Sequence, residues 1–287
     1  MNRVGRMTRI VLLVMIGSPL AALSGCETNP YTGRSQLLMI SVSEDMQLGT
    51  QAYQQVKNDP KVRQSQDPRE IEPVKRVAAH IIEAAKRSKY GEMAKQFQWE
   101  VTVIKDDKTM NAFALPGGKI AVYTGIFPVA KSEAGLAAVL GHEVTHALAR
   151  HGAERISEGE LTNATLQAIG AAAGASGMNP MLSQGAMAAL GAGAQVGVLL
   201  PFSRAHESEA DYIGILLAAD AGYDPRESVS LWERMEQLSR GGGPSEFLST
   251  HPSNETRIDQ LKKWMPEAMG IYQSRPAVPA AALPALH

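Results

Sequence analysis

Two histidines and a glutamate stand in the order His142-Glu143-Val-Thr-His146. On an α-helix, residues four apart lie about 40° apart around the axis and one turn apart along it, so both imidazoles can reach one metal ion. The glutamate between them can hold a water molecule and accept its proton. The spacing therefore predicts a metal centre that activates water for hydrolysis.

The residues around this pentapeptide decide between a metal site and an ordinary surface helix with two solvated histidines. Residues 135–140 and 147–149 are almost entirely apolar, which predicts that the helix is buried. Ser132 is a suitable N-cap for it, with Glu133 in the first turn. Buried imidazoles need polar partners, and a metal ion is a good one. The flanks therefore favour the metal site.

A catalytic zinc ion needs a third protein ligand and one open position. The segment from Ser203 to Asp211, at the start of a predicted helix, offers the carboxylates of Glu207, Glu209 and Asp211. His206 is a competing candidate, but it lies about 100° around the helix from Glu207. The residues alone leave the choice among the carboxylates open.

The pattern Ser-Arg-x-x-Glu-x-x-Ala-Asp at 203–211, downstream of His-Glu-x-x-His, resembles the family of zinc peptidases that includes the HtpX, CAAX-prenyl endopeptidase and Oma types. In the family motif the third ligand is the glutamate four residues before the aspartate, which implies Glu207. Helix geometry agrees, because Glu207 and Asp211 share a face while Glu209 points elsewhere. Asp211 is then expected to accept the N–H of a ligating histidine. The alternative is a solvated acidic helix face.

Three short segments with period-two patterns, 99–104, 110–115 and 119–124, predict a small β-sheet just before the histidine helix. The resemblance extends to residues 111–118, and it implies that this segment forms a sheet edge beside the active site. An extended peptide could add to that edge as a further strand. An ordinary core hairpin is compatible with the same pattern. The edge residues implied in this way are Asn111, Ala112, Phe113 and Ala114.

His251-Pro252, with Arg257 five residues further on, resembles the His-Pro-x-x-x-x-Arg motif of the same family. The resemblance implies that His251 lies close to the metal and can occupy its open position, which keeps the enzyme latent. It also implies that Arg257 binds the substrate backbone or the oxyanion. A helix cap with a surface ion pair is the simpler alternative.

The N-terminus has the features of a secretory signal. Three arginines within the first nine residues precede the apolar run 10–16 and the small residues that lead to Cys26. Residues 23–26 resemble a bacterial lipobox, which implies lipidation of Cys26, the one cysteine in the chain; an incidental thiol is the alternative. Glu27 is not an aspartate, which by the same resemblance favours the outer membrane.

The chain is therefore divided into a lipoprotein signal peptide (1–25), a lipid-anchored tether leading into a docking segment (26–42), a metallopeptidase domain (43–270) and a disordered Pro/Ala-rich tail (271–287). The Ala/Gly/Met-rich residues 161–202 are expected to form two closely packed helices, with a membrane hairpin as the alternative. The expected fold is α+β: a mostly helical, zincin-like metalloprotease domain with a small β-sheet beside the active-site helix.

The segment from Asn29 to Leu37 is also similar to periplasmic lipoprotein members of the family, of the LoiP type. The helical repeat domain of the BepA type is not expected, because the chain ends soon after Trp264. The chain is 44% hydrophobic with a net charge of −1, and it has no basic patch, so nucleic acid is not an expected partner.

These observations predict a zinc-dependent endopeptidase on the periplasmic side of the outer membrane, with one Zn²⁺ per chain. The family resemblance alone implies that its substrates are misfolded or unassembled envelope proteins. His142, His146 and Glu207 are the expected ligands, and Glu143 is the expected general base. Two other classes remain open: a chaperone or assembly factor for outer-membrane proteins with weak or latent proteolysis, and a scaffold lipoprotein whose metal is structural.

Overall fold

The computed structural model describes residues 25–175, 202–240, 246–251 and 256–286. The predicted signal peptide, apart from Gly25, lies outside these residues, as does the second part of the Ala/Gly/Met-rich segment.

Helices make up most of the described chain, and two small sheets complete it. The helices are α1 (Val42–Asn58), α2 (Pro68–Arg87), α3 (Gly91–Gln96), α4 (Phe127–Ala130), α5 (Glu133–Leu148), α6 (His151–Ala175), α8 (Arg204–Asp220), α9 (Arg226–Arg240), α10 (Glu246–Thr250) and α11 (Arg257–Gln273). The strands are β1 (Cys26–Thr28), β2 (Ser35–Leu37), β3 (Glu100–Ile104), β4 (Ala112–Leu115) and β5 (Lys119–Tyr123). The predicted class, a mostly helical α+β fold with a small sheet, is confirmed.

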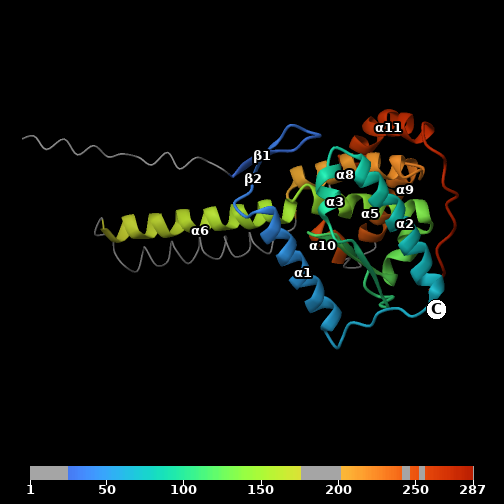
Figure 1. Cartoon of the computed structure of the whole chain (residues 1–287), viewed down its shortest axis with the longest axis horizontal. Coiled ribbons are helices and arrows are strands. Elements are labelled where there is room, and N and C mark those ends of the chain that lie inside the picture. The colour runs from blue at the N-terminus through green and yellow to red at the C-terminus, as the bar shows by residue number, and fades with distance from the viewer. Residues whose placement is uncertain (1–24, 176–201, 241–245, 252–255, 287) are drawn as a thin grey trace, which may run out of the picture.

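The helix α5 is the centre of this fold. Every one of its residues is buried, and α2, α8, α9 and β4 surround it (Figure 1). Ser132 caps its N-terminus by accepting a hydrogen bond from the backbone N–H of Gly135 (3.2 Å). The residues of the His-Glu-x-x-His pattern are therefore held on a helix that cannot turn without disturbing the core.

One sheet lies beside α5, with strand order β3-β5-β4. The strands β3 and β5 are parallel, whereas β4 pairs with β5 in antiparallel fashion. Within this sheet β4 has β5 as its single neighbour, so β4 is an edge strand that also packs against α5. The three strands lie where the period-two patterns predicted them.

The helices α5 and α8 cross at two glycines. A Cβ placed on Gly141 would lie 2.6 Å from the carbonyl oxygen of Gly214, and one placed on Gly214 would lie 2.8 Å from the amide nitrogen of His142. Neither position has room for a methyl group. This close crossing brings the carboxylates of α8 within reach of the histidines of α5.

We expect Gly214→Ala to lower the free energy of unfolding by about 1–3 kcal/mol, because the added methyl forces the two backbones apart. Thermal unfolding followed by circular dichroism should show a Tm lower by about 2–12 °C. Gly270→Ala is the matched control, because a Cβ at Gly270 in α11 meets nothing within 4 Å. If Gly214→Ala were as stable as the control, the close crossing would be wrong.

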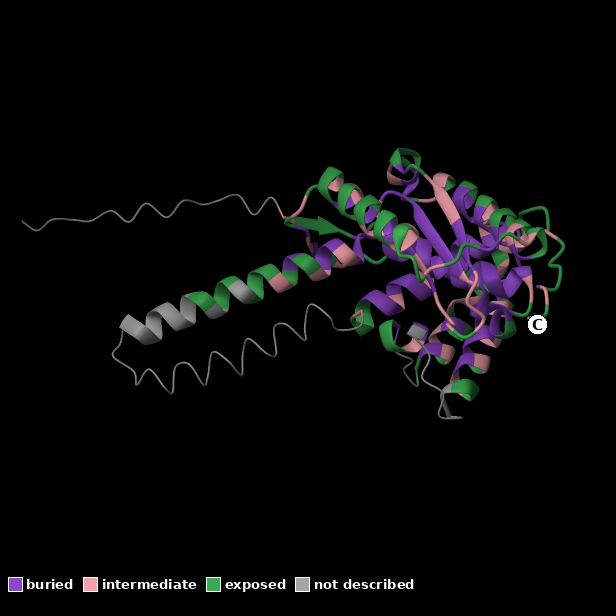
Figure 2. Ribbon diagram, turned by 90° about the horizontal axis from the view of Figure 1, so that it is seen from below, coloured by how far each residue is buried: buried purple, intermediate pink, exposed green. Residues whose placement is uncertain are grey.

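The helix α6 runs away from the body of the molecule, and its described side chains become more exposed between His151 and Gln167 (Figures 1 and 2). Among the described helices, α6 included, none combines the length and the apolar character needed to cross a bilayer. The residues beyond Ala175 that the membrane-hairpin alternative also required lie outside the described chain.

The C-terminal residues differ from the disordered tail expected for 271–287. The helix α11 continues to Gln273, and the residues after it follow the domain surface as an extended segment. The backbone N–H of Val278 donates to the oxygen of Gly222 (2.8 Å), and that of Glu133 donates to the oxygen of Ala281 (2.9 Å). The low-complexity sequence did not indicate this packing, because main-chain hydrogen bonds need no particular side chains.

The residues predicted as a tether also pack on the domain. The strands β1 and β2 form a hairpin, and Gln36 of β2 is buried, where its side-chain N–H donates to the oxygen of Ala149 (2.8 Å). The backbone N–H of Met39 donates to the hydroxyl of Ser157 (2.8 Å). Residues 26–45, called the N-terminal segment below, thus lie against the end of α5 and the start of α6.

Candidate metal centre and active site

The helix α5 places two imidazoles side by side in the interior. The rings of His142 and His146 lie 4.7 Å apart between centroids, and their Nε2 atoms are 3.1 Å apart. Both side chains are buried. Burial lowers the pKa of His146, which keeps this imidazole in the neutral form that binds a metal.

The helix α8 presents Glu207 to both rings. One carboxylate oxygen lies 3.4 Å from Nε2 of His142, and the other lies 3.3 Å from Nε2 of His146. Burial alone would raise the pKa of Glu207, but the neighbouring histidines lower it well below its ordinary value, so this carboxylate is ionised.

Asp211, one turn further along α8, lies on the other side of His142. Its Oδ1 is 3.0 Å from His142 Nδ1, so the Nδ1–H can donate to it. This contact orients the ring so that Nε2 faces Glu207. Glu209, in contrast, lies away from both rings of the pair and contacts His151 instead (3.1 Å).

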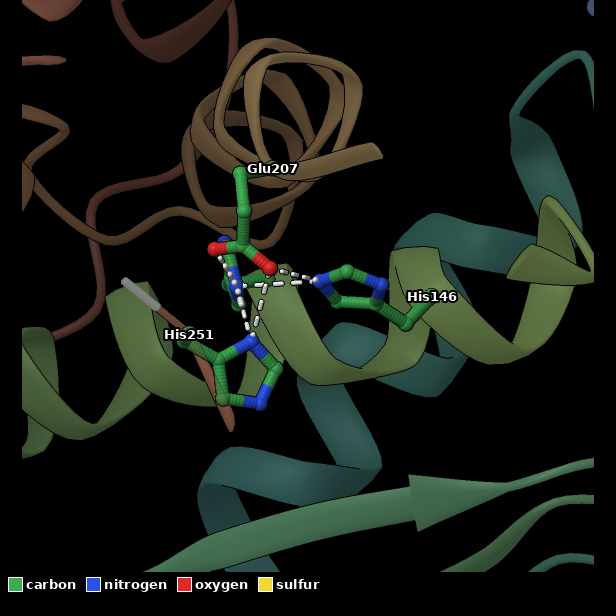
Figure 3. A group of neighbouring side chains, drawn as sticks. His146, Glu207 and His251 are labelled. Atoms are coloured by element: carbon green, nitrogen blue, oxygen red, sulfur yellow. Dashed lines mark hydrogen bonds and ion pairs between the residues drawn. The ribbon is translucent and has the colours of Figure 1, made fainter. Parts of the chain in front are cut away.

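His251, immediately after α10, completes the group. Its Nδ1 lies 3.0 Å from Glu207 and 3.2 Å from Nε2 of His142. Figure 3 shows the Glu207 carboxylate between the rings of His146 and His251. The four side chains offer donor atoms that all lie within 4.8 Å of one another, and all four are buried. Nitrogen and carboxylate donors at this spacing fit Zn²⁺.

Glu143 lies beside this donor set and is not part of it. Its Oε1 is 3.4 Å from Nε2 of His251, and its carboxylate accepts a hydrogen bond from the backbone N–H of Ala114 in β4. Burial raises the pKa of Glu143 to about 7. A carboxyl group with this pKa can both accept and release a proton near neutral pH.

Arg257 lies behind the donors, and this differs from the substrate contact expected of it. Its Nη1 is 2.9 Å from Glu207 and its Nε is 2.5 Å from Asp211, while the guanidinium stacks on the ring of Trp232 (3.3 Å). The side chain is 2% exposed. The reason for the difference is charge: two buried carboxylates need a cation, and Arg257 supplies it.

Comparison with known proteins shows that the chain matches a known peptidase family. The model of peptidase family M48 matches residues 68–265. The chain belongs to peptidase family M48. The match includes every residue of the donor set, and members of this family are metallopeptidases that use zinc.

Three curated relatives of this M48 peptidase illustrate the range. The mitochondrial metalloendopeptidase OMA1 of Saccharomyces cerevisiae is 32% identical over 92% of this chain and 76% of its own length. Human OMA1 is 34% identical over 86% of this chain and 47% of its own length. The β-barrel assembly-enhancing protease of Escherichia coli K12 is 26% identical over 87% of this chain and 50% of its own length. The chain thus spans about half the length of the last two relatives. The family match and the OMA1 relatives show that it is a metalloendopeptidase.

These relatives contradict the predicted location at the outer membrane. The relatives of higher identity are mitochondrial enzymes, and the bacterial protease is more distant. The prediction was wrong because it rested on a short N-terminal pattern. An Arg-rich segment that is poor in acids is also typical of mitochondrial targeting. Lipid attachment at Cys26, an exposed residue at the start of β1, is not shown by these relatives either.

Sequence reasoning missed a second buried group in this M48 peptidase, formed by His151, Glu154, His206 and Glu209. The ring of His151 lies 4.9 Å from that of His146, and it stacks on the ring of His206 (4.5 Å). A third histidine, five residues after His146, was the signal in the sequence that could have indicated this group.

Proposed function

We propose that this M48 peptidase hydrolyses peptide bonds in extended segments of unfolded proteins, with His142, His146 and Glu207 as zinc ligands and Glu143 as general base. The position of Glu143 carries the proposal. Its carboxylate lies against the donor set on one side and against the edge strand β4 on the other. A base in this place can act on a peptide bond held along β4.

Zn²⁺ at these donors supplies Lewis acidity, which lowers the pKa of water and polarises a peptide carbonyl. Glu143 takes the proton of the attacking water and passes it to the leaving amine. Asp211 holds the Nδ1–H of His142, which fixes the tautomer whose Nε2 binds metal. Arg257 keeps Glu207 and Asp211 in place through paired charges.

The edge strand β4 is suited to bind substrate through its main chain. The backbone N–H of Tyr123 in β5 donates to the oxygen of Asn111 (3.0 Å), so Asn111 faces β5. Alternate residues of an antiparallel strand direct their backbone groups to opposite edges. The backbone groups of Ala112 and Ala114 therefore face away from β5. The N–H of Ala114 is already bonded to Glu143, so the proposed pairing uses the groups of Ala112 and the carbonyl of Ala114. Main-chain pairing there would accept many substrate sequences.

Cleavage of casein before and after metal removal tests the proposal. We expect the purified protein to cleave casein, to lose activity when a chelator strips the metal, and to regain it when Zn²⁺ is restored. Cleavage that persists in a sample shown to be free of metal would contradict the proposal.

His251 contacts both Glu207 (3.0 Å) and Glu143 (3.4 Å), and we infer that its ring lies where a substrate would approach the base. We expect His251→Ala to raise casein cleavage about tenfold, because the variant loses a hydrogen bond to a charged group worth about 1.5 kcal/mol in the closed arrangement. Initial rates at equal zinc occupancy are the measurement.

His80→Ala is the control for this variant, because His80 on α2 bonds to the hydroxyl of Tyr223 (3.0 Å), away from the donors. Loss of both zinc and activity in His251→Ala would show instead that His251 is a permanent fourth ligand. That outcome would favour a structural metal. Retained binding of unfolded protein with no cleavage in any variant would favour a chaperone role.

A further inference from the structure

The proposed mechanism assigns no role to the second buried group of histidines and glutamates. The side chains of His151, Glu154, His206 and Glu209 are each at most 5% exposed. His151 joins this group to the metal centre, because its Nδ1 lies 3.0 Å from Nδ1 of His146. This contact is on the side of His146 opposite to the donor set.

The chemistry of the metal site assigns every proton along this path. Nε2 of His146 must be free of a proton to bind a metal, so its proton is on Nδ1. That N–H can donate only to an unprotonated Nδ1 of His151. The proton of His151 is then on Nε2, which lies 3.1 Å from the Glu209 carboxylate and donates to it. The result is a single chain of hydrogen bonds from His146 through His151 to Glu209.

The two ligand histidines are thus oriented in different ways. His142 donates directly to a carboxylate, that of Asp211. His146 reaches the Glu209 carboxylate through an intervening imidazole. A carboxylate behind a ligating histidine fixes its ring and raises its basicity.

The N-terminal segment holds the far end of this chain. The hydroxyl of Thr32 and Nη2 of Arg34 (2.8 Å) both donate to Glu209. Nη1 of Arg34 pairs with Glu154 (2.5 Å), which also contacts His206 (3.0 Å). Arg34 therefore supplies the cation between the two carboxylates, and the group has no need of a second metal ion.

The same segment also stabilises the turn between α5 and α6, which places His151 against His146. Arg150, between α5 and α6, has φ of 56°, a left-handed conformation that costs a non-glycine residue about 1–2 kcal/mol. Its guanidinium contacts Asp45 (3.1 Å) and the oxygen of Ile40 (2.6 Å). Both partners belong to the N-terminal segment and lie outside the matched residues 68–265.

We propose that His151 is a positioning residue for the ligand His146, and that the N-terminal segment completes the metal centre by holding Glu209 and Arg150. The proposal rests on the zinc site given under the proposed function. It means that the core matched by the family model is not sufficient for full metal affinity.

Zinc affinity by chelator competition and the visible spectrum of the Co²⁺-substituted protein test this, both on the full chain. We expect His151→Leu to weaken zinc binding about 10- to 100-fold and to alter the Co²⁺ bands, because His146 loses its acceptor. His151→Asn keeps an oxygen near the position of Nδ1, so it should recover part of the affinity. Arg34→Met should weaken binding in the same direction.

Arg87→Met is the matched control, because Arg87 forms an exposed ion pair with Asp220 (2.6 Å) and should leave both readouts unchanged. Wild-type affinity and spectrum in folded His151→Leu would overturn the proposal. If that variant does not fold, Arg34→Met decides in the same way. Wild-type protein that binds no zinc would instead refute the proposed function, so the two failures are distinguishable.

Discussion

Glu143→Gln should bind zinc as the wild-type protein does and lose about 10²–10⁴-fold in the rate of casein cleavage. The amide has nearly the same shape as the carboxylate but cannot accept the proton of water, and general acid–base catalysis is worth about this factor. Glu143 lies outside the donor set, so its loss removes no ligand. Metal analysis and initial rates on the same sample provide the measurement.

Glu160→Gln is the matched control, because it makes the same change on the exposed surface of α6. It should cleave at the wild-type rate. A Glu143→Gln variant that cleaves casein as fast as this control would refute the role of Glu143. A variant that loses its zinc would place Glu143 among the ligands.

Glu207→Ala should lose bound zinc and, with it, all metal-dependent cleavage. A site with two remaining ligands from α5 falls short of the three that catalytic zinc needs. Changing a group behind a ligand already costs about 10–100-fold in metal affinity, so removing the ligand itself should cost more than about 100-fold. Titration with a competing chelator gives the affinity.

Asp220→Asn, at the C-terminal end of the same helix, controls for general effects on α8. It should keep wild-type zinc affinity. Equal zinc affinity in Glu207→Ala and in this control would mean that the metal binds elsewhere in the chain.

The parts of the site that follow from helical periodicity were predictable from sequence. His142 and His146 are one turn apart, and Glu207 and Asp211 repeat this spacing on a second helix. Spacing within a helix is fixed by the backbone, so each pair was expected on one face. The crossing of the two helices was not predictable, because it depends on the glycines at 141 and 214 meeting each other.

Side-chain partners between distant segments were harder to predict. The motif that contains His251 and Arg257 indicated that these residues lie near the metal. It did not indicate which charged groups each side chain contacts. In the structure His251 contacts Glu207, whereas Arg257 forms ion pairs with Asp211 and Glu207. The choice depends on which charges lie unpaired in the folded interior, and a linear pattern does not contain that information.

The contacts made by the two ends of the described chain could not be predicted for a related reason. Residues 26–42 were expected to be a tether leading into a docking segment, without any partner being identified for them. In the structure Arg34 pairs with Glu154 and Glu209, more than a hundred residues away. The C-terminal residues bond through their backbone to Gly222 and Lys131. Neither kind of contact leaves a periodic signal in the sequence.

The position of the metal is the most direct test of the account. Crystals of the full chain grown with Zn²⁺, measured above and below the zinc absorption edge, give an anomalous difference map. We expect one peak, bounded by the Nε2 atoms of His142 and His146 and the carboxylate of Glu207. The absence of a peak there, or a peak between Glu154 and Glu209 instead, would contradict the assignment of the metal centre.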